Sequence, residues 1–376
     1  MPQTATIPSR LVSAITPVRA ACALFGFLLL SVAIGPALKS SFGAHGVLND
    51  FLSFYTGAKL LPRGKLYNYK STLDLQRHLG MMNPPMVYDR LPFYALLFSP
   101  LARLDYKNAY LIFQIASILS FALAVLCWRR FGAGTCLLLA GWSSAMAFTL
   151  LRGQDVAFVF LFASASAALL RKEYPFSAGA ILALGLIKWH FLLLFPLMII
   201  AKKLTRFGLG FASGVGVLIL LSFAAYSQWP SDYWHVLQMT QITPHLTSMP
   251  NLWSLVHGGP GGLALQTLGI ALGAVLCWCA FRSESSLDEA MAISLLAGVI
   301  FSTHAYAYDC VLMLPAVAAA ASRLHSRPNF QFWLAIGFGA CPVLLQFKGG
   351  RFIAQFAFLA LFLWLSMEVI RRGKRE

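Results

Sequence analysis

The sequence predicts an all-α polytopic membrane protein with about 12 membrane segments. Of its 376 residues, 59% are apolar and only 11% are charged, whereas about a quarter of the residues in a soluble domain are charged. Apolar runs of about 18 to 20 residues recur from Ala20 to Glu368, and a helix of that length crosses about 30 Å of hydrocarbon. We interpret residues 1–376 as a single membrane domain.

The first apolar run, from Ala20 to Leu38, is expected to be a retained span. It is long for a signal peptide, and no small-x-small cleavage site precedes Lys39. The predicted membrane segments are 20–38, 108–128, 133–150, 156–170, 176–187, 191–201, 207–226, 262–281, 289–303, 308–322, 330–347 and 352–370.

The net charge of +16 is interpreted as a topological signal. Basic pairs such as Arg129–Arg130, Arg171–Lys172 and Lys202–Lys203 mark the ends of apolar runs, as expected at the cytoplasmic face. The sequence has no basic-aromatic binding module and no glycine-rich phosphate loop, so neither a nucleic acid nor a nucleotide partner is expected. Seven cysteines without metal-ligand spacing predict no metal site, and no cofactor is expected.

One region, Phe176 to Ile200, permits two topologies. It is either one 25-residue span or two short segments broken at Lys188, because a lone charge in mid-membrane is costly. Two segments place ten of the later Lys and Arg residues on the cytoplasmic side and two outside, as the positive-inside rule requires. We therefore predict two broken or re-entrant helices that line a cavity, with both termini in the cytoplasm.

Two large outer loops are predicted, at 39–107 and 227–261. The first is expected to contain amphipathic helices near 51–61 and 71–79, followed by an interfacial or re-entrant stretch at 91–104. The second is rich in Trp, Tyr, His and Pro, which suits the level of the lipid headgroups.

Under this topology the unusual polar residues gather on the outer side of a cytoplasmic membrane, facing the periplasm or exterior. They are Asn49, Asp50, Arg90, Arg152, Gln154, Asp155, Lys188, His190, His235, His245, His304, Tyr306, Tyr308 and Asp309. Each has a structural alternative. Asp50 is at a helix start, where a carboxylate can cap, and Lys188 can reach the interface through its long stem. Residues 152–155 and 304–309 can be simple turns, and Asp89 is expected to be a surface charge.

Several motifs in this sequence resemble those of glycosyltransferase family 87. The matching stretches are Asn49 to Ala58, Gly64 to Tyr67, Leu91 to Leu104, Arg152 to Gln154, Ala178 to Lys188 and His304 to Asp309. The resemblance implies a class C glycosyltransferase fold with a polyprenyl-phosphate-sugar donor. It implies that Asp50 is the catalytic base and that His304 lies beside the site. Tyr55, in the same motif as Asp50, is a further candidate for substrate binding.

The resemblance also implies a substrate class. Family members include polyprenyl-phosphate-mannose-dependent mannosyltransferases, so mannose is the expected sugar and a lipid or glycolipid the expected acceptor. The sequence departs from the family pattern at Leu91 to Tyr94, in place of a Tyr-Pro-Pro type of stretch, and at Trp189-His190, where Pro is common. These departures indicate a different donor or acceptor.

The chemistry of sugar transfer fits these residues. An inverting transfer needs one carboxylate to remove the acceptor's proton and cations to hold the departing phosphate. Asp50 offers the carboxylate, and Lys188, Arg152 and Arg90 are the candidate cations. The alternative is a transporter or flippase of lipid-linked sugars, because broken helices around a mid-membrane charge also mark transport sites. No internal repeat supports that alternative.

Overall fold

The computed structural model describes residues 15–41, 49–80, 86–239, 248–256, 261–324 and 326–373, and these residues form helices and turns without a strand. The elements before Lys188 are α1 (Pro17–Ser41), α2 (Phe51–Leu60), η2 (Leu61–Arg63), α3 (Tyr69–His78), α4 (Pro92–Ala102), α5 (Tyr106–Cys127), η3 (Arg129–Phe131), α6 (Ala133–Gly141), α7 (Ser144–Arg152), α8 (Val156–Arg171) and α9 (Pro175–Ala183). They are followed by η4 (Leu184–Leu192), α10 (Phe195–Ala201), α11 (Thr205–Ala225), α12 (Trp229–Leu237), α13 (Leu252–Val256), α14 (Gly262–Arg282), α15 (Leu287–Phe301), η7 (Ala307–Met313), α16 (Leu314–Arg323), α17 (Pro328–Ala340), η8 (Cys341–Gln346) and α18 (Gly350–Arg372).

The long helices form a bundle suited to a bilayer. Within the described residues, seven helices are long and apolar enough to cross a membrane, or eight if α6 and α7, bent by 48° at their junction, count as one span. Large apolar side chains are exposed along α1, α5, α11 and α14, where lipid is the natural solvent. The all-helical membrane class is therefore confirmed, while the count of about 12 segments stays a prediction.

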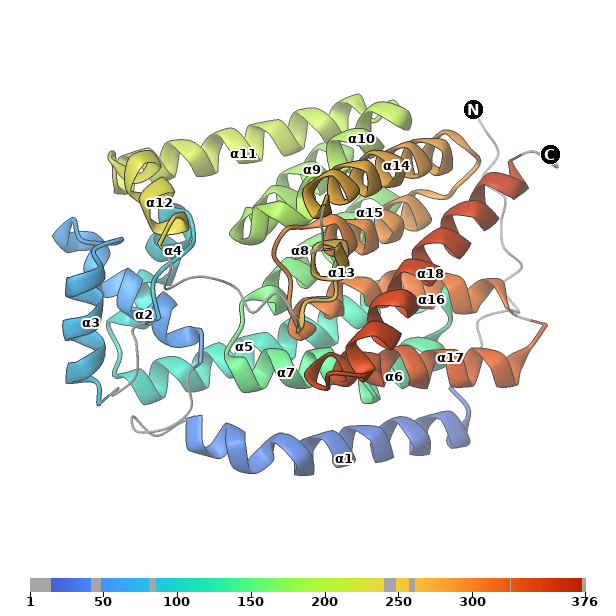
Figure 1. The fold of residues 1–376 in the computed structure, drawn as a ribbon, viewed down its shortest axis with the longest axis horizontal. Helices are drawn as coiled ribbons and strands as arrows, with labels where there is room; N and C mark the ends of the chain where they lie inside the picture. The colour runs from blue at the N-terminus through green and yellow to red at the C-terminus, as the bar shows by residue number, and fades with distance from the viewer. Residues whose placement is uncertain are drawn as a thin grey trace.

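Two opposite ends of the bundle are defined by polar contacts. At the Asp288 end, Arg171 pairs with Asp288 at 2.6 Å, and the Lys202 ammonium donates to the Ser285 carbonyl at 2.7 Å. At the Asp50 end, Lys188 pairs with Asp309 at 2.7 Å. Figure 1 shows α2, α3, α4 and α12 gathered at one end of the long helices. These helices belong to the two predicted outer loops.

The chain reverses direction at Lys188. This residue leaves the helical region, with φ −127° and ψ 68°, which confirms the predicted break. Helices α9 and α11 run parallel, because Gly210 lies against Phe176 at the start of α9 and Gly214 lies against Ala183 at its end. The chain must therefore return through α10 to the Asp288 end before α11 begins.

The segment predicted to be the first outer loop folds onto the bundle. The helices expected near 51–61 and 71–79 correspond to α2 and α3, and the apolar stretch corresponds to α4. The expectation that α2 is amphipathic is wrong, because every residue in it except Lys59 is buried. Its rings pack into an aromatic core in which Phe51 and Phe98 are 5.6 Å apart and Phe54 and Tyr94 are 5.4 Å apart.

The second outer loop is described only in part. It supplies α12 and α13, whereas residues 240–247 and 257–260, with His245 and His257, lie outside the described residues. The ring of Tyr233 in α12 contacts the ring of Tyr67 in the first loop at a tilt of 50°, with ring centroids 5.8 Å apart. The two outer loops are thus in direct contact.

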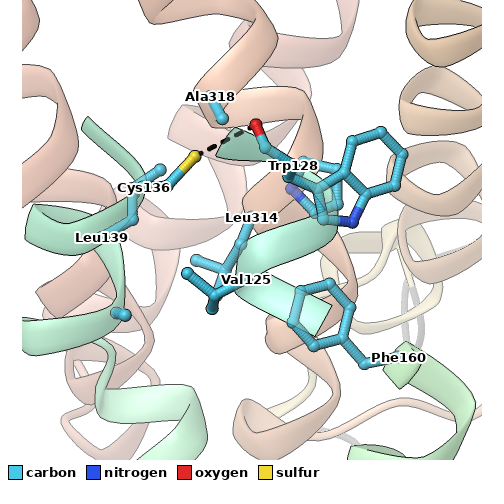
Figure 2. A pocket seen from close by; sticks show the side chains of 9 residues that line it. Val125, Trp128, Cys136, Leu139, Phe160, Leu314 and Ala318 are labelled. Carbon is cyan, nitrogen blue, oxygen red and sulfur yellow. Dashed lines mark hydrogen bonds between the residues drawn. The ribbon is translucent and has the colours of Figure 1, made fainter. Parts of the chain in front are cut away.

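A small apolar hollow lies between α5, α6, α8 and α16. It is lined by residues that include Val125, Trp128, Leu139, Phe160 and Leu314 (Figure 2). The only polar contact drawn there is a thiol hydrogen bond, in which Cys136 donates to the Trp128 carbonyl at 3.3 Å. No candidate site residue lines this hollow, so it is a packing feature of the core.

Candidate active site

Asp50 lies at the start of α2 without capping it. Its side chain makes no capping hydrogen bond; instead, its carboxylate accepts a hydrogen bond from Gln154 Nε2. Its own amide donates to the Arg152 carbonyl oxygen at 2.8 Å. This backbone hydrogen bond joins the start of α2 to the turn after α7. The Asp50 carboxylate does not cap the helix and can therefore serve another role.

The turn from Arg152 to Asp155 brings several site groups together. Gly153 has φ +60°, and a Cβ added there would lie 2.9 Å from the Cβ of Phe51, so a glycine is needed for this close approach. The turn holds Gln154 and Asp155 in the interior, with Gln154 only 3% exposed. It also directs Asp155 toward two cations.

These cations and carboxylates form an ionic cluster of Asp89, Arg90, Asp155, Lys188 and Asp309. Arg90 donates through Nε to Asp155 at 2.8 Å and pairs with Asp89 at 2.6 Å. The Lys188 ammonium pairs with Asp309 at 2.7 Å and lies 3.6 Å from Asp155. With Lys188 only 4% exposed, the alternative in which it reaches the interface does not hold. Buried charges of this kind persist only when they are paired.

The segment 304–309 closes one side of the cluster. The Tyr306 amide donates to the second oxygen of Asp309 at 2.9 Å, which orients that carboxylate toward Lys188. Lys188 also lies over the Tyr308 ring, 4.8 Å from its centroid. The His304 ring contacts the rings of Tyr306 and His190 at centroid distances of 4.9 Å and 6.0 Å. The segment 304–309 therefore contacts Lys188 and His190 directly and forms part of the candidate site.

Most of the predicted site residues converge, and Arg152 and Tyr55 are placed differently from the rest. Arg152 supplies its backbone carbonyl, while its side chain is exposed. Tyr55 donates its hydroxyl to the Leu104 carbonyl at 2.7 Å, and its ring lies edge-on to Tyr106 at 5.4 Å. None of the described contacts of Tyr55 is with the ionic cluster.

Three residues of this region, Asp89, Trp189 and Tyr233, were not predicted to be part of the site. Asp89 was expected to be a surface charge, but it pairs with Arg90 and its field raises the pKa of Asp50. Trp189 donates through Nε1 to the Tyr233 hydroxyl at 3.4 Å, which brings the second outer loop to the edge of the cluster. The adjacency of Asp89 to Arg90 in the sequence was a signal for the first of these.

The environment of Asp50 adjusts its proton affinity. Burial raises the pKa of this carboxyl from 3.8 to about 6, although the hydrogen bond from Gln154 lowers it. The Asp89 charge raises this pKa further, while Lys188 and Arg90 lower it. Such a carboxyl is ionised at neutral pH and binds a proton more readily than an exposed Asp, as a general base requires.

We next consider whether side chains of the described residues could bind a metal ion. The described residues contain no group of three or more His, Cys, Asp or Glu side chains that could hold one. The prediction that no metal takes part stays a prediction.

Comparison with known protein families decides the class of this protein. The model of glycosyltransferase family 87 matches residues 92–305, which is more than half of the chain. The chain belongs to glycosyltransferase family 87. It is therefore a membrane glycosyltransferase, and the transporter alternative is not supported. No curated protein and no solved structure matches the chain.

The matched range includes the turn at Arg152, Lys188 and His304. It begins after Asp50 and ends before Asp309, so the roles of these two carboxylates depend on the geometry described above.

Proposed function

We propose that the protein is an inverting hexosyltransferase that takes a sugar from a polyprenyl-phosphate donor. The acceptor is a lipid or a lipid-linked glycan, and mannose is the first sugar to test. The observation that carries this proposal is the placement of Asp50: a half-buried carboxylate, held by Gln154 rather than by a helix end, beside the cationic residues Arg90 and Lys188.

The proposed reaction is a single displacement. Asp50 removes the proton from the acceptor hydroxyl while the hydroxyl oxygen forms a bond to the anomeric carbon. The bond between that carbon and the phosphate oxygen breaks, and polyprenyl phosphate leaves with the electron pair. Attack from the face opposite to the leaving group inverts the anomeric configuration, as in other inverting sugar chemistry.

Arg90 and Arg152 are proposed to meet the donor phosphate. Both are arginines, which bind phosphate through two parallel hydrogen bonds. The Arg152 side chain is exposed. The Arg90 side chain pairs with Asp89 and Asp155 but is 10% exposed, whereas that of Lys188, enclosed between Asp309 and Asp155, is 4% exposed. This burial supports a different role for Lys188, which is to hold the two carboxylates in place rather than to contact the phosphate.

The Asp50 end is proposed to face the periplasm or exterior of a cytoplasmic membrane. The short turns at the Asp288 end contain basic pairs such as Arg171–Lys172 and Lys202–Lys203, as expected for a cytoplasmic face. A single cysteine at Asp74 of α3 should react with an impermeant reagent from outside, in a background without the native cysteines. A single cysteine at Ser326 should be protected, and the same accessibility at both positions would contradict this orientation.

The test of function uses purified protein, a synthetic polyprenyl-phosphate mannose and a membrane lipid extract. The expected result is a new glycolipid together with free polyprenyl phosphate, both detected by mass spectrometry. Parallel reactions with other polyprenyl-phosphate hexoses identify the sugar. An unchanged donor in every reaction would contradict the proposed function.

A further inference from the structure

Among the described residues, one polar atom of the Gln154 amide has a hydrogen-bond partner and the other has none. Its Nε2 donates to Asp50, while its Oε1 is buried and has no hydrogen-bond partner among the residues that the structure describes. The assignment of the two atoms follows from chemistry, because an ionised carboxylate only accepts hydrogen bonds and the amide nitrogen must face it.

A buried acceptor without a partner is unfavourable and needs an explanation. Gln76 is a contrast, since its Nε2 donates to the Met86 carbonyl and its Oε1 accepts from the Met86 amide. Gln355 Oε1 also lacks a partner among the described residues, but this side chain lies beside Met249 and Ser254. Gln154 differs from both because its unpaired oxygen belongs to the same amide group that holds the proposed base.

The partner of this oxygen must be a hydrogen-bond donor without a negative charge. An ionised phosphate only accepts hydrogen bonds, and a polyprenyl chain has no donor. A sugar or cyclitol hydroxyl fits both conditions. The Asp50 carboxylate and Gln154 Oε1 are two acceptors linked through the amide group that donates to Asp50, and two adjacent hydroxyl groups present two donors.

We propose that Gln154 Oε1 binds the acceptor hydroxyl next to the one that Asp50 deprotonates, so the acceptor is a vicinal diol. This inference rests on the proposed role of Asp50 as base. It makes Gln154 a specificity residue, because a lipid alcohol with a single hydroxyl would leave the buried oxygen unpaired. Sites built to bind a hydroxyl discriminate strongly against molecules that lack it.

The first experiment removes vicinal diols from the acceptor pool. Periodate cleaves carbon–carbon bonds between adjacent hydroxyls and leaves isolated hydroxyls intact. A membrane lipid extract that has been oxidised with periodate and then reduced should lose acceptor capacity at least about tenfold, measured as glycolipid formed from polyprenyl-phosphate mannose. Undiminished capacity would overturn the inference.

The second experiment assigns the effect to Gln154. Gln154→Met should lower kcat/KM for the lipid acceptor about tenfold or more and leave the donor KM unchanged. The matched control is Gln114→Met, which removes a buried amide that donates to the Leu150 carbonyl at 2.8 Å and should leave acceptor kinetics unchanged. If Gln154→Met does not fold, Gln154→Asn keeps the amide on a shorter stem and should show a smaller loss in the same direction.

The outcomes separate this inference from the proposed function. A change in donor KM alone, or equal losses in Gln154→Met and Gln114→Met, would overturn the diol assignment while the transfer reaction remains. Full activity of Asp50→Asn would remove the base itself, and the diol assignment would fall with it.

Discussion

The two ends of the bundle differ in how their carboxylates are paired with cations. At the Asp288 end, Asp288 pairs with both Arg130 and Arg171, and Glu289 pairs with Arg323 at 2.5 Å. At the Asp50 end, the carboxylates of the candidate site are Asp50, Asp89, Asp155 and Asp309, and the cations that pair with this group are Arg90 and Lys188.

This difference indicates a structural role for one end and a reactive role for the other. Where arginines outnumber carboxylates, each negative charge is compensated and the contact fastens neighbouring turns. Where carboxylates outnumber cations, one of them, Asp50, has the neutral amide of Gln154 as its side-chain hydrogen-bond partner among the described residues. Proteins break local rules of this kind mainly at functional sites.

The largest effect is expected for Asp50→Asn. Asn keeps the shape but cannot take a proton, and general-base catalysis is typically worth about 10² to 10⁴-fold. We expect kcat to fall at least about a hundredfold, measured by glycolipid formation, while the thermal midpoint in detergent does not fall. Near-normal turnover would contradict the assignment and move the search for the base to Asp155 or Asp309.

A second prediction compares one buried ion pair from each end. Lys188→Met leaves Asp309 without its cation, and breaking a buried pair from one side typically costs about 3 to 5 kcal/mol of folding free energy. We expect a lower thermal midpoint and lost transfer. Lys188→Met with Asp309→Leu should recover the midpoint without the activity, because no charge is then left unpaired.

The control for this comparison is Asp288→Asn. It should lower the thermal midpoint but leave kcat per folded molecule unchanged, since Asp288 is at the opposite end of the bundle. Lost turnover in folded Asp288→Asn would mean that the two ends are not functionally distinct.

A smaller effect is expected for Arg152→Ala. If the Arg152 guanidinium meets the donor phosphate, its loss removes a charge-assisted hydrogen bond worth about 1.5 to 3 kcal/mol. The donor KM should rise, with the acceptor KM and the thermal midpoint unchanged. Arg63→Ala, at an exposed arginine of the same outer face, is the matched control, and equal kinetics in both variants would exclude Arg152 from the donor site.

The sequence predicted the helices well because their signals are local. Apolar runs and basic pairs indicated the break at Lys188 and the direction of the chain around it. The burial of α2 was not predictable in this way. The hydroxyls of its polar residues Ser53 and Thr56 donate to the backbone carbonyls of Asp50 and Leu52, one turn earlier, so the helix can be enclosed by aromatic rings.

The sequence predicted which residues form the candidate site better than it predicted the ion pairs between them. Lys188 and Arg90 stood out as charges near a membrane, and the motif resemblance singled out Asp50. Their partners come from distant parts of the chain: Asp155 contacts Arg90 across 65 positions and Asp309 contacts Lys188 across 121. No local pattern encodes such contacts, which explains why the ion pair between Lys188 and Asp309 was not predicted.

The last prediction uses the pKa of Asp50 to test which end carries the reaction. Because burial raises this pKa to about 6, the base is ionised above pH 6 and protonated below it. At pH 5 only about a tenth of the carboxyl is ionised, so kcat/KM should fall about tenfold from its value at neutral pH.

The raised pKa of Asp50 makes stability change with pH in the direction opposite to activity. A carboxyl whose pKa is higher in the folded protein than its usual 3.8 stabilises the fold in its protonated form, and this contribution is lost as the pH rises through about 6. Activity should therefore fall between pH 7 and pH 5 without unfolding by this group. Removing the Gln154 hydrogen bond, which lowers the pKa, should move the acid limb to higher pH in Gln154→Met. A profile that stays level between pH 5 and pH 7, or an acid limb that persists in the residual activity of Asp50→Asn, would show that another group controls the reaction.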